Sequence, residues 1–102
     1  MKKNDVIKSY NQYILSTYTR VPAVFVKGKG VDLTDIHGKK YLDFFPGWGV
    51  NNVGHCHPKV MAAVRDQIST LIHIPNNFYH LNQAKLAKEI IRNAFPGKVF
   101  FC

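Results

Sequence analysis

The residues best suited to chemistry are concentrated in one glycine-rich stretch, residues 45–57. Gly47 and Gly49 look at first like the start of a dinucleotide-binding fingerprint. That fingerprint requires a further glycine three residues after the second, where this chain has Asn52. It also requires a helix directly after the glycines, whereas His55 to His57 intervene. We therefore reject dinucleotide binding, and we read 27–30 as a turn because it lacks the spacing of a phosphate-binding P-loop.

His55, Cys56 and His57 are all residue types that bind metal ions. A structural zinc site needs about four ligands, usually in two separated pairs, and no other His or Cys of this chain has a matching spacing. Cys56 also lacks an identifiable activating group that would make it a nucleophile. We predict no metal site and expect a tight loop whose imidazoles form hydrogen bonds with backbone groups.

Large aromatic and amide side chains lie in two irregular segments rather than on periodic apolar faces. In rigid loops that contain glycine, such side chains resemble the lining of a small-molecule pocket. The alternative is that Trp48 and Phe78 fill the junction between strands and helices, and composition leaves both interpretations open. The residues concerned are Trp48, Asn51, Asn52, Asn76, Asn77, Phe78 and Tyr79.

Hydrophobic spacing predicts the elements that position these loops. Apolar residues three and four apart predict helices from Asp5 to Tyr18, with Asn4 as N-cap, from Pro58 to about Leu71, and over 82–95. Short β-branched or alternating runs at 23–26, 31–35 and 40–44, separated by glycine turns, predict an antiparallel meander. The apolar run 98–102 predicts the start of a strand buried on both faces, which is typical of a parallel sheet inside a larger α/β protein.

Length and composition exclude several classes of protein. The chain has 102 residues, of which 46% are hydrophobic and 20% charged, which is unlike a disordered chain. No apolar run approaches the roughly 20 residues of a membrane-spanning helix. Two cysteines cannot form a disulfide scaffold, so we expect a reducing, cytoplasmic location.

The net charge of +8 raises the alternative of a free-standing, basic nucleic-acid-binding module. The basic residues are scattered, however, with no block of five like charges and no basic helix face interleaved with aromatics. Solvated lysine heads on apolar stems explain this distribution better, as does an acidic remainder missing from this chain.

A series of landmarks in the chain resembles a known family. From Tyr18 to Phe101 the sequence is similar to the N-terminal segment of the class-III, pyridoxal-phosphate-dependent aminotransferases, and acetylornithine and ornithine aminotransferases are the closest subgroup. No single motif carries this resemblance, which rests on many landmarks in the same order and register. They are 28–30, 33–35, Gly38, 41–44, 54–58, Gln67, Asn76, 78–79 and 86–87.

This resemblance implies a fold and an activity. The fold class is α/β, with an α+β segment here: the N-terminal part of a fold-type-I enzyme, with a helical arm over 1–20, a meander and pocket loop over 21–57, and helices leading into the large cofactor-binding domain over 58–102. Such enzymes are homodimers or dimers of dimers, with active sites at the subunit interface. They transfer an amino group from acetylornithine, ornithine or a similar ω-amine to 2-oxoglutarate.

The resemblance also implies functional residues. Tyr18 aligns with a tyrosine that holds the amino-acid end of the substrate in ornithine-type enzymes, and Trp48 occupies a pocket position where relatives carry tyrosine or a branched aliphatic residue. The segment containing Asn76, Phe78 and Tyr79 resembles a loop at the active-site entrance. In that loop Pro75 replaces a common serine.

The catalytic lysine and the cofactor-binding residues of the family have no counterpart in this segment. By resemblance they belong to the region that would follow Cys102. We therefore expect pyridoxal 5'-phosphate to be bound outside this segment and the fragment to be inactive alone. The remaining alternative is a degenerate structural fragment that pairs with a longer chain.

Overall fold

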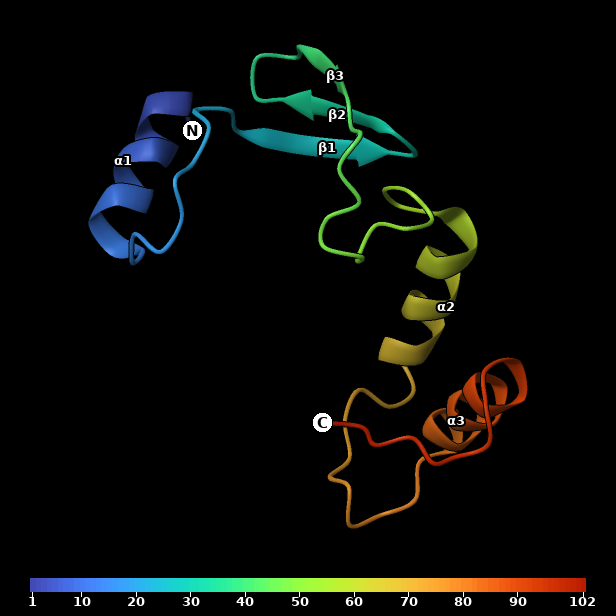
Figure 1. Ribbon diagram of the computed structural model, residues 1–102. Helices are drawn as coiled ribbons and strands as arrows, with labels where there is room; N and C mark the ends of the chain where they lie inside the picture. Colours follow the sequence, from blue (N-terminus) through green and yellow to red (C-terminus); the bar gives the residue numbers. More distant parts are fainter. The chain divides into compact units, whose positions relative to one another are not determined.

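The computed structural model describes all residues 1–102 and contains three helices and a three-stranded sheet (Figure 1). In chain order the elements are α1 (Lys3–Tyr13), β1 (Phe25–Lys29), β2 (Asp32–Asp35), β3 (Lys40–Leu42), α2 (Pro58–Ile68) and α3 (Leu81–Asn93). The chain divides into two compact units, Met1–Val64 and Arg65–Cys102. Apart from the absence of a final strand, this is the α+β segment predicted from the sequence.

The sheet is an antiparallel meander in the order β1-β2-β3, as predicted. Lys29 pairs with Asp32, so the first turn holds two residues and is tighter than the predicted turn over 27–30. Gly30 stands in this turn at φ 58°, a left-handed conformation that glycine adopts without a side-chain clash. Strand β1 begins at Phe25 rather than at residue 23, with an irregularity in register between Phe25 and Lys27.

Asp35 organises the second turn of the sheet. It is the one buried polar residue, with 8% of its surface exposed. Its Oδ1 accepts hydrogen bonds from the backbone N–H groups of His37 and Lys39, both at 2.9 Å, and its Oδ2 accepts from the Tyr41 hydroxyl at 3.1 Å. One carboxylate therefore satisfies donors from the turn and from β3 at the same time.

Helix α1 is shorter than predicted. It ends at Tyr13, and Ile14 is extended at φ −115° and ψ 129°, so Tyr18 lies in the connection to the sheet. The serine, β-branched and aromatic residues of 16–19 are weak helix formers, which explains why the apolar spacing does not continue the helix. The predicted N-cap, Asn4, is wrong as well: the N-cap is Lys2, whose backbone N–H donates to Asp5 Oδ2 at 3.1 Å.

The other two helices agree in type and approximate extent with the prediction. Pro58 is the first residue of α2, where its missing N–H leaves no hydrogen bond unmade. Helix α3 starts at Leu81 because His80 is its N-cap, with Nδ1 accepting from the Asn82 N–H at 3.1 Å. It ends at Asn93, before Pro96.

The predicted final strand is not formed. Residues 98–102 have no strand partner, and the backbone contact made there is a hydrogen bond from Asn76 Nδ2 to the Phe101 carbonyl, at 3.0 Å. A strand exists only through its ladder with a neighbour. The residues are apolar enough for a strand, but the fold described here supplies no neighbour for them.

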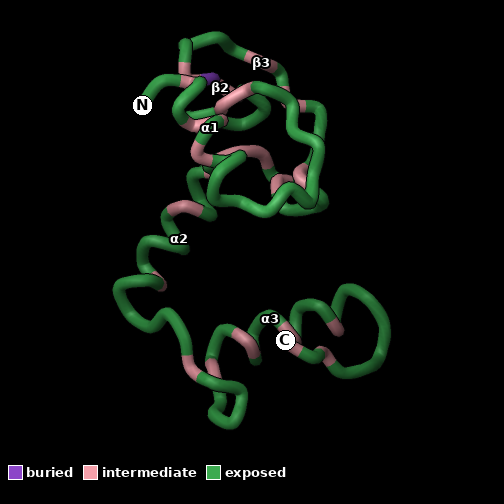
Figure 2. Tube along the Cα trace, turned by 90° about the vertical axis from the view of Figure 1, so that its left-hand side faces the viewer, coloured by how far each residue is buried: buried purple, intermediate pink, exposed green.

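No hydrophobic residue of the chain is in the buried class (Figure 2). Most residues of the apolar stripes that predicted α2 and α3 are exposed, including Val60, Val64, Leu86 and Ile90, and Ile91 is half-buried. The local order therefore depends on backbone and side-chain hydrogen bonds more than on a hydrophobic core. None of the three helices is both long and apolar enough to cross a membrane.

We predict that Asp35→Ala loosens the second turn of the sheet, because three donors lose their acceptor. Hydrogen exchange of the His37 and Lys39 amides should accelerate by roughly tenfold. Asp32→Ala is the matched control on the same strand, since the Asp32 side chain is exposed and accepts no hydrogen bond. Equal exchange rates in the two variants would contradict this account of the turn.

Candidate functional site

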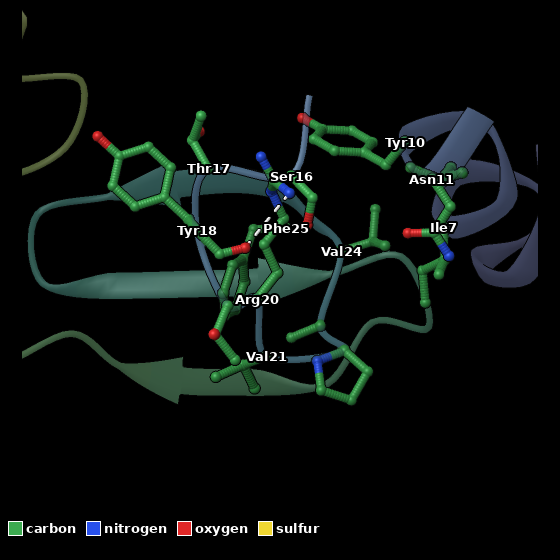
Figure 3. A pocket seen from close by; sticks show the side chains of 14 residues that line it. Ile7, Tyr10, Asn11, Ser16, Thr17, Tyr18, Arg20, Val21, Val24 and Phe25 are labelled. Atoms are coloured by element: carbon green, nitrogen blue, oxygen red, sulfur yellow. Dashed lines mark hydrogen bonds between the residues drawn. The ribbon is translucent and has the colours of Figure 1, made fainter. Parts of the chain in front are cut away.

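Tyr18 lines an open cavity of about 1000 Å³ within the first unit (Figure 3). Its walls come from α1, through Ile7 and Tyr10, and from the connection over 16–25. Tyr18 itself is 72% exposed. The lining combines aromatic rings and aliphatic side chains with hydroxyl groups, which suits a ligand that has both an apolar stem and a polar end.

Arg20 links the connection to helix α1 across this cavity. Its guanidinium carbon lies 5.4 Å from the centroid of the Tyr10 ring, a cation–π distance. Its Nη1 also donates to the Tyr18 carbonyl, at 3.5 Å, the bond drawn in Figure 3. Arg20 thus helps to fix the backbone that presents Tyr18.

Trp48 lies in the glycine-rich loop, in a left-handed backbone conformation. Its φ is 57°, and both neighbouring glycines also have positive φ, 60° at Gly47 and 88° at Gly49. The Phe45 and Trp48 rings meet edge to face, with centroids 5.3 Å apart. The indole is 89% exposed. Such a conformation is costly for a residue with a side chain, so the surrounding turn must hold it there.

The turn around Trp48 is closed by its own backbone. The N–H groups of Gly49 and Asn51 both donate to the Pro46 carbonyl, at 3.2 and 3.0 Å, and the Gly54 N–H donates to the Asn51 carbonyl at 2.8 Å. These bonds determine the shape of the loop but do not attach it to the sheet.

The attachment to the sheet is made by Asp43 and His55, at the two ends of the loop. His55 Nε2 lies 2.6 Å from Asp43 Oδ2, and both side chains are largely buried, with 19% and 17% of their surfaces exposed. Asp43 Oδ1 also accepts from the Phe45 N–H at 3.0 Å. The expectation that this loop's imidazoles would bind backbone groups is therefore wrong for His55. His57 does not follow it either, because its buried Nδ1 has no partner.

In the second unit, Asn76 connects three segments. Its Nδ2 donates to the Phe101 carbonyl at 3.0 Å, and its Oδ1 accepts from Gln83 Nε2 at 3.2 Å. Phe78 and Tyr79 follow on the same loop, and both side chains are exposed. A cavity of about 280 Å³ lies nearby, and its lining includes His80 and Leu86 but none of the three predicted site residues.

The structure thus distributes the predicted residues between the two units, Tyr18 and Trp48 in the first and the other three in the second. Tyr18 lines the first cavity and Trp48 does not. The residues that sequence reasoning missed are Asp35, Asp43 and His55. One signal was available for the last two: an aspartate directly after a strand and a histidine directly after a glycine, at opposite ends of one loop.

Hydrogen bonds determine the electrostatics of these two aspartates. The side-chain hydrogen bond with His55 is the main cause that lowers the pKa of Asp43 below its ordinary value of 3.8, and the Phe45 N–H adds to it. At Asp35, burial acts to raise the pKa, but the donors of Lys39, His37 and Tyr41 together outweigh it and lower the pKa. Both carboxylates are thus held in the charged form.

Comparison with known proteins assigns the chain to a family. The model of the family described as "Aminotransferase class-III" matches residues 13–102. The chain belongs to this family of aminotransferases. It is 49% identical over 102 residues to the acetylornithine aminotransferase of Methanocaldococcus jannaschii, an alignment that covers 100% of this chain and 26% of the relative.

Two solved structures are similar as well. The acetylornithine aminotransferase of Elizabethkingia anophelis matches with a TM-score of 0.85 and 29% identity, over 90% of this chain and 24% of that one. An ornithine aminotransferase of Toxoplasma gondii, described with partial occupancy of PLP at its active site, matches with a TM-score of 0.83 and 32% identity, over 89% of this chain and 21% of that one. The chain spans about a quarter of the length of the curated relatives it matches.

We predict that the Asp43–His55 pair makes the stability of the sheet and loop dependent on pH. Because folding lowers the pKa of Asp43, its contribution is complete above the ordinary value of 3.8 and is lost as the pH falls through the lower, folded-state pKa. Acid unfolding of Asp43→Asn, followed by circular dichroism, should therefore depend less on pH below 3.8 than that of the wild type. Asp32→Asn is the control, and the same flattening in that variant would contradict the prediction.

Proposed function

We propose that this chain is the N-terminal segment of a pyridoxal-phosphate-dependent aminotransferase that transfers an amino group from acetylornithine, ornithine or a similar ω-amine to 2-oxoglutarate. The observation that carries the proposal is the 49% identity to an acetylornithine aminotransferase along the entire chain. The two structural matches, to an acetylornithine and an ornithine aminotransferase, support the same group of amino donors. We further propose a cytoplasmic homodimer.

In this proposal the chain supplies part of the wall of the substrate pocket. Tyr18, which lines an open cavity, contacts the amino-acid end of the donor. Trp48 limits the size of the donor, because a large exposed ring on a rigid turn leaves little room for movement. Phe78 and Tyr79 line the entrance, and Asn76 both belongs to this loop and ties it to α3 and to residue 101.

The residues of this chain do not fit a cofactor site by themselves. Pyridoxal phosphate needs a lysine, an acid for its pyridine nitrogen and donors for its phosphate. The two carboxylates with lowered pKa values are already engaged, Asp35 by turn N–H groups and Asp43 by His55. We therefore propose that the cofactor and the catalytic lysine belong to another part of the complete protein, and that the chain alone is inactive.

The first test of this proposal compares the chain with a chimera. In the chimera, this chain replaces the matching 102 residues of the Methanocaldococcus jannaschii acetylornithine aminotransferase. The chimera should transaminate acetylornithine. The isolated chain, mixed with one equivalent of pyridoxal phosphate and reduced with borohydride, should show no cofactor on a specific lysine by mass spectrometry. An inactive but folded chimera, or one specifically labelled lysine on the chain, would contradict the proposal.

The second test concerns donor size. In the chimera, Trp48→Ala should raise kcat/KM for acetylornithine relative to the smaller ornithine by about tenfold, because removing the indole opens space for the bulkier donor. Val50→Ala is the matched control, since Val50 is an exposed apolar residue of the same loop. If both variants have the wild-type donor ratio, Trp48 does not determine donor size.

A further inference from the structure

We propose that Asp43 and His55 form a clamp that fixes the Trp48 loop, residues 44–54, to the sheet, and that both are positioning residues for donor selection. The role of the two residues in donor selection rests on the proposed function, whereas the clamp itself rests on the geometry of the loop and the sheet. Four features of the structure support the clamp, two on the side of His55 and two on the side of Asp43.

His55 is attached to the first turn of the sheet through its backbone. Its N–H donates to the Gly30 carbonyl at 2.8 Å, and its carbonyl accepts from the Gly30 N–H at 2.9 Å, forming an isolated antiparallel bridge. Gly54, directly before it, has a φ of 81°, and a Cβ there would lie 3.0 Å from the Gly30 carbonyl oxygen. At Gly54 the loop backbone therefore lies so close to the backbone of Gly30 that a side chain would not fit between them.

The His55 side chain lies against a second glycine of the sheet. A Cβ on Gly28 would stand 2.9 Å from both Cβ and Cγ of His55, closer than such atoms approach in real structures. Gly28 is in β1 and has no positive φ, so its lack of a side chain is needed for space and not for backbone conformation. The backbone of β1 at Gly28 thus packs directly against the first atoms of the His55 side chain.

Asp43 holds the other end of the loop in the same way. Its N–H donates to the Val31 carbonyl at 2.8 Å, which continues the pairing of β2 and β3. Its two carboxylate oxygens then divide between the loop and the clamp, Oδ1 to the Phe45 N–H and Oδ2 to His55 Nε2. Both ends of the loop are therefore fastened to the first turn of the sheet and to each other.

The consequence concerns Trp48. The internal hydrogen bonds of the loop run among residues 46–54 and reach no strand, so they fix its shape but not its orientation. The residues that connect it to the sheet are those at its base. If the clamp opens, the loop retains its turn but moves as a unit, and the indole no longer occupies one place in the donor pocket.

The clamp is tested by ¹⁵N relaxation on the 102-residue chain. The backbone order parameter of residue 48 should fall from about 0.85 to below 0.6 in His55→Gln, whose flexible amide does not reproduce the position of the imidazole nitrogen against Asp43 Oδ2. Gly28→Ala should have the same effect by a different route, because the added methyl displaces the His55 side chain. His37→Gln, on the same sheet but with a ring that makes no hydrogen bond, is the control and should leave the order parameter unchanged.

Three results would contradict the clamp. The first is an ordered residue 48 in both His55→Gln and Gly28→Ala, and the second is a residue 48 that is already mobile in the wild type. The third is an equal loss of order in residue 48 and in Leu33 at the centre of β2, because the pair would then support the whole sheet and not the loop.

Donor selection is tested in the chimera by a double-mutant cycle. His55→Gln should change the ratio of kcat/KM for acetylornithine and ornithine in the wild-type background and should have no further effect in the Trp48→Ala background. Additive effects would show that His55 does not act through Trp48. Failure of the proposed function appears instead as an inactive chimera with wild-type relaxation data, so the two failures are distinguishable.

Discussion

The orientation of the glycine-rich loop depends on the contacts at its base, and the shortest of these is the hydrogen bond between the Asp43 carboxylate and the His55 imidazole, at 2.6 Å. The chain buries no hydrophobic side chain, so burial does not hold the glycine-rich loop against the sheet. A charge-assisted hydrogen bond between two largely buried side chains is stronger than a neutral one and gives a definite direction. Together with the backbone bonds of Asp43 to Val31 and of His55 to Gly30, it fixes both ends of the segment between residues 43 and 55.

The same principle recurs at Asp35, one turn earlier in the chain. Both aspartates stand at a strand end, both accept backbone N–H groups of the residues that follow, and both have a lowered pKa. Aspartate is suited to this position because its short side chain reaches the backbone two residues further on. A sheet of three short strands is marginal by itself, and these closures add order where the ladder ends.

The sequence was sufficient to predict the meander and the last two helices because local patterns determine them: alternation for β2, and apolar spacing after Pro58 for α2. The sequence was insufficient where helix propensity competes with apolar spacing, or where an element needs a partner that is distant in the chain. Helix α1 ends at Tyr13 because propensity outweighs apolar spacing, and residues 98–102 form no strand because a ladder needs a neighbour.

The Asp43–His55 pair joins residues 12 apart, beyond any periodic signal. Trp48 was identified by its type and by family resemblance, whereas its left-handed backbone is visible only in the structure.

Exposure distinguishes a pocket wall from a complete pocket. A site for a small molecule encloses most of its ligand and presents a few polar groups that converge on it. Here the rings of Trp48, Phe78 and Tyr79 face solvent, and Tyr18 lines an open cavity. Exposed side chains of this kind cover only part of a ligand, so in the proposed pocket they discriminate weakly between donors until further residues enclose the space. Fixing the orientation of the wall in advance then matters, because a loop that is already ordered adds its selectivity without a further loss of conformational entropy on binding.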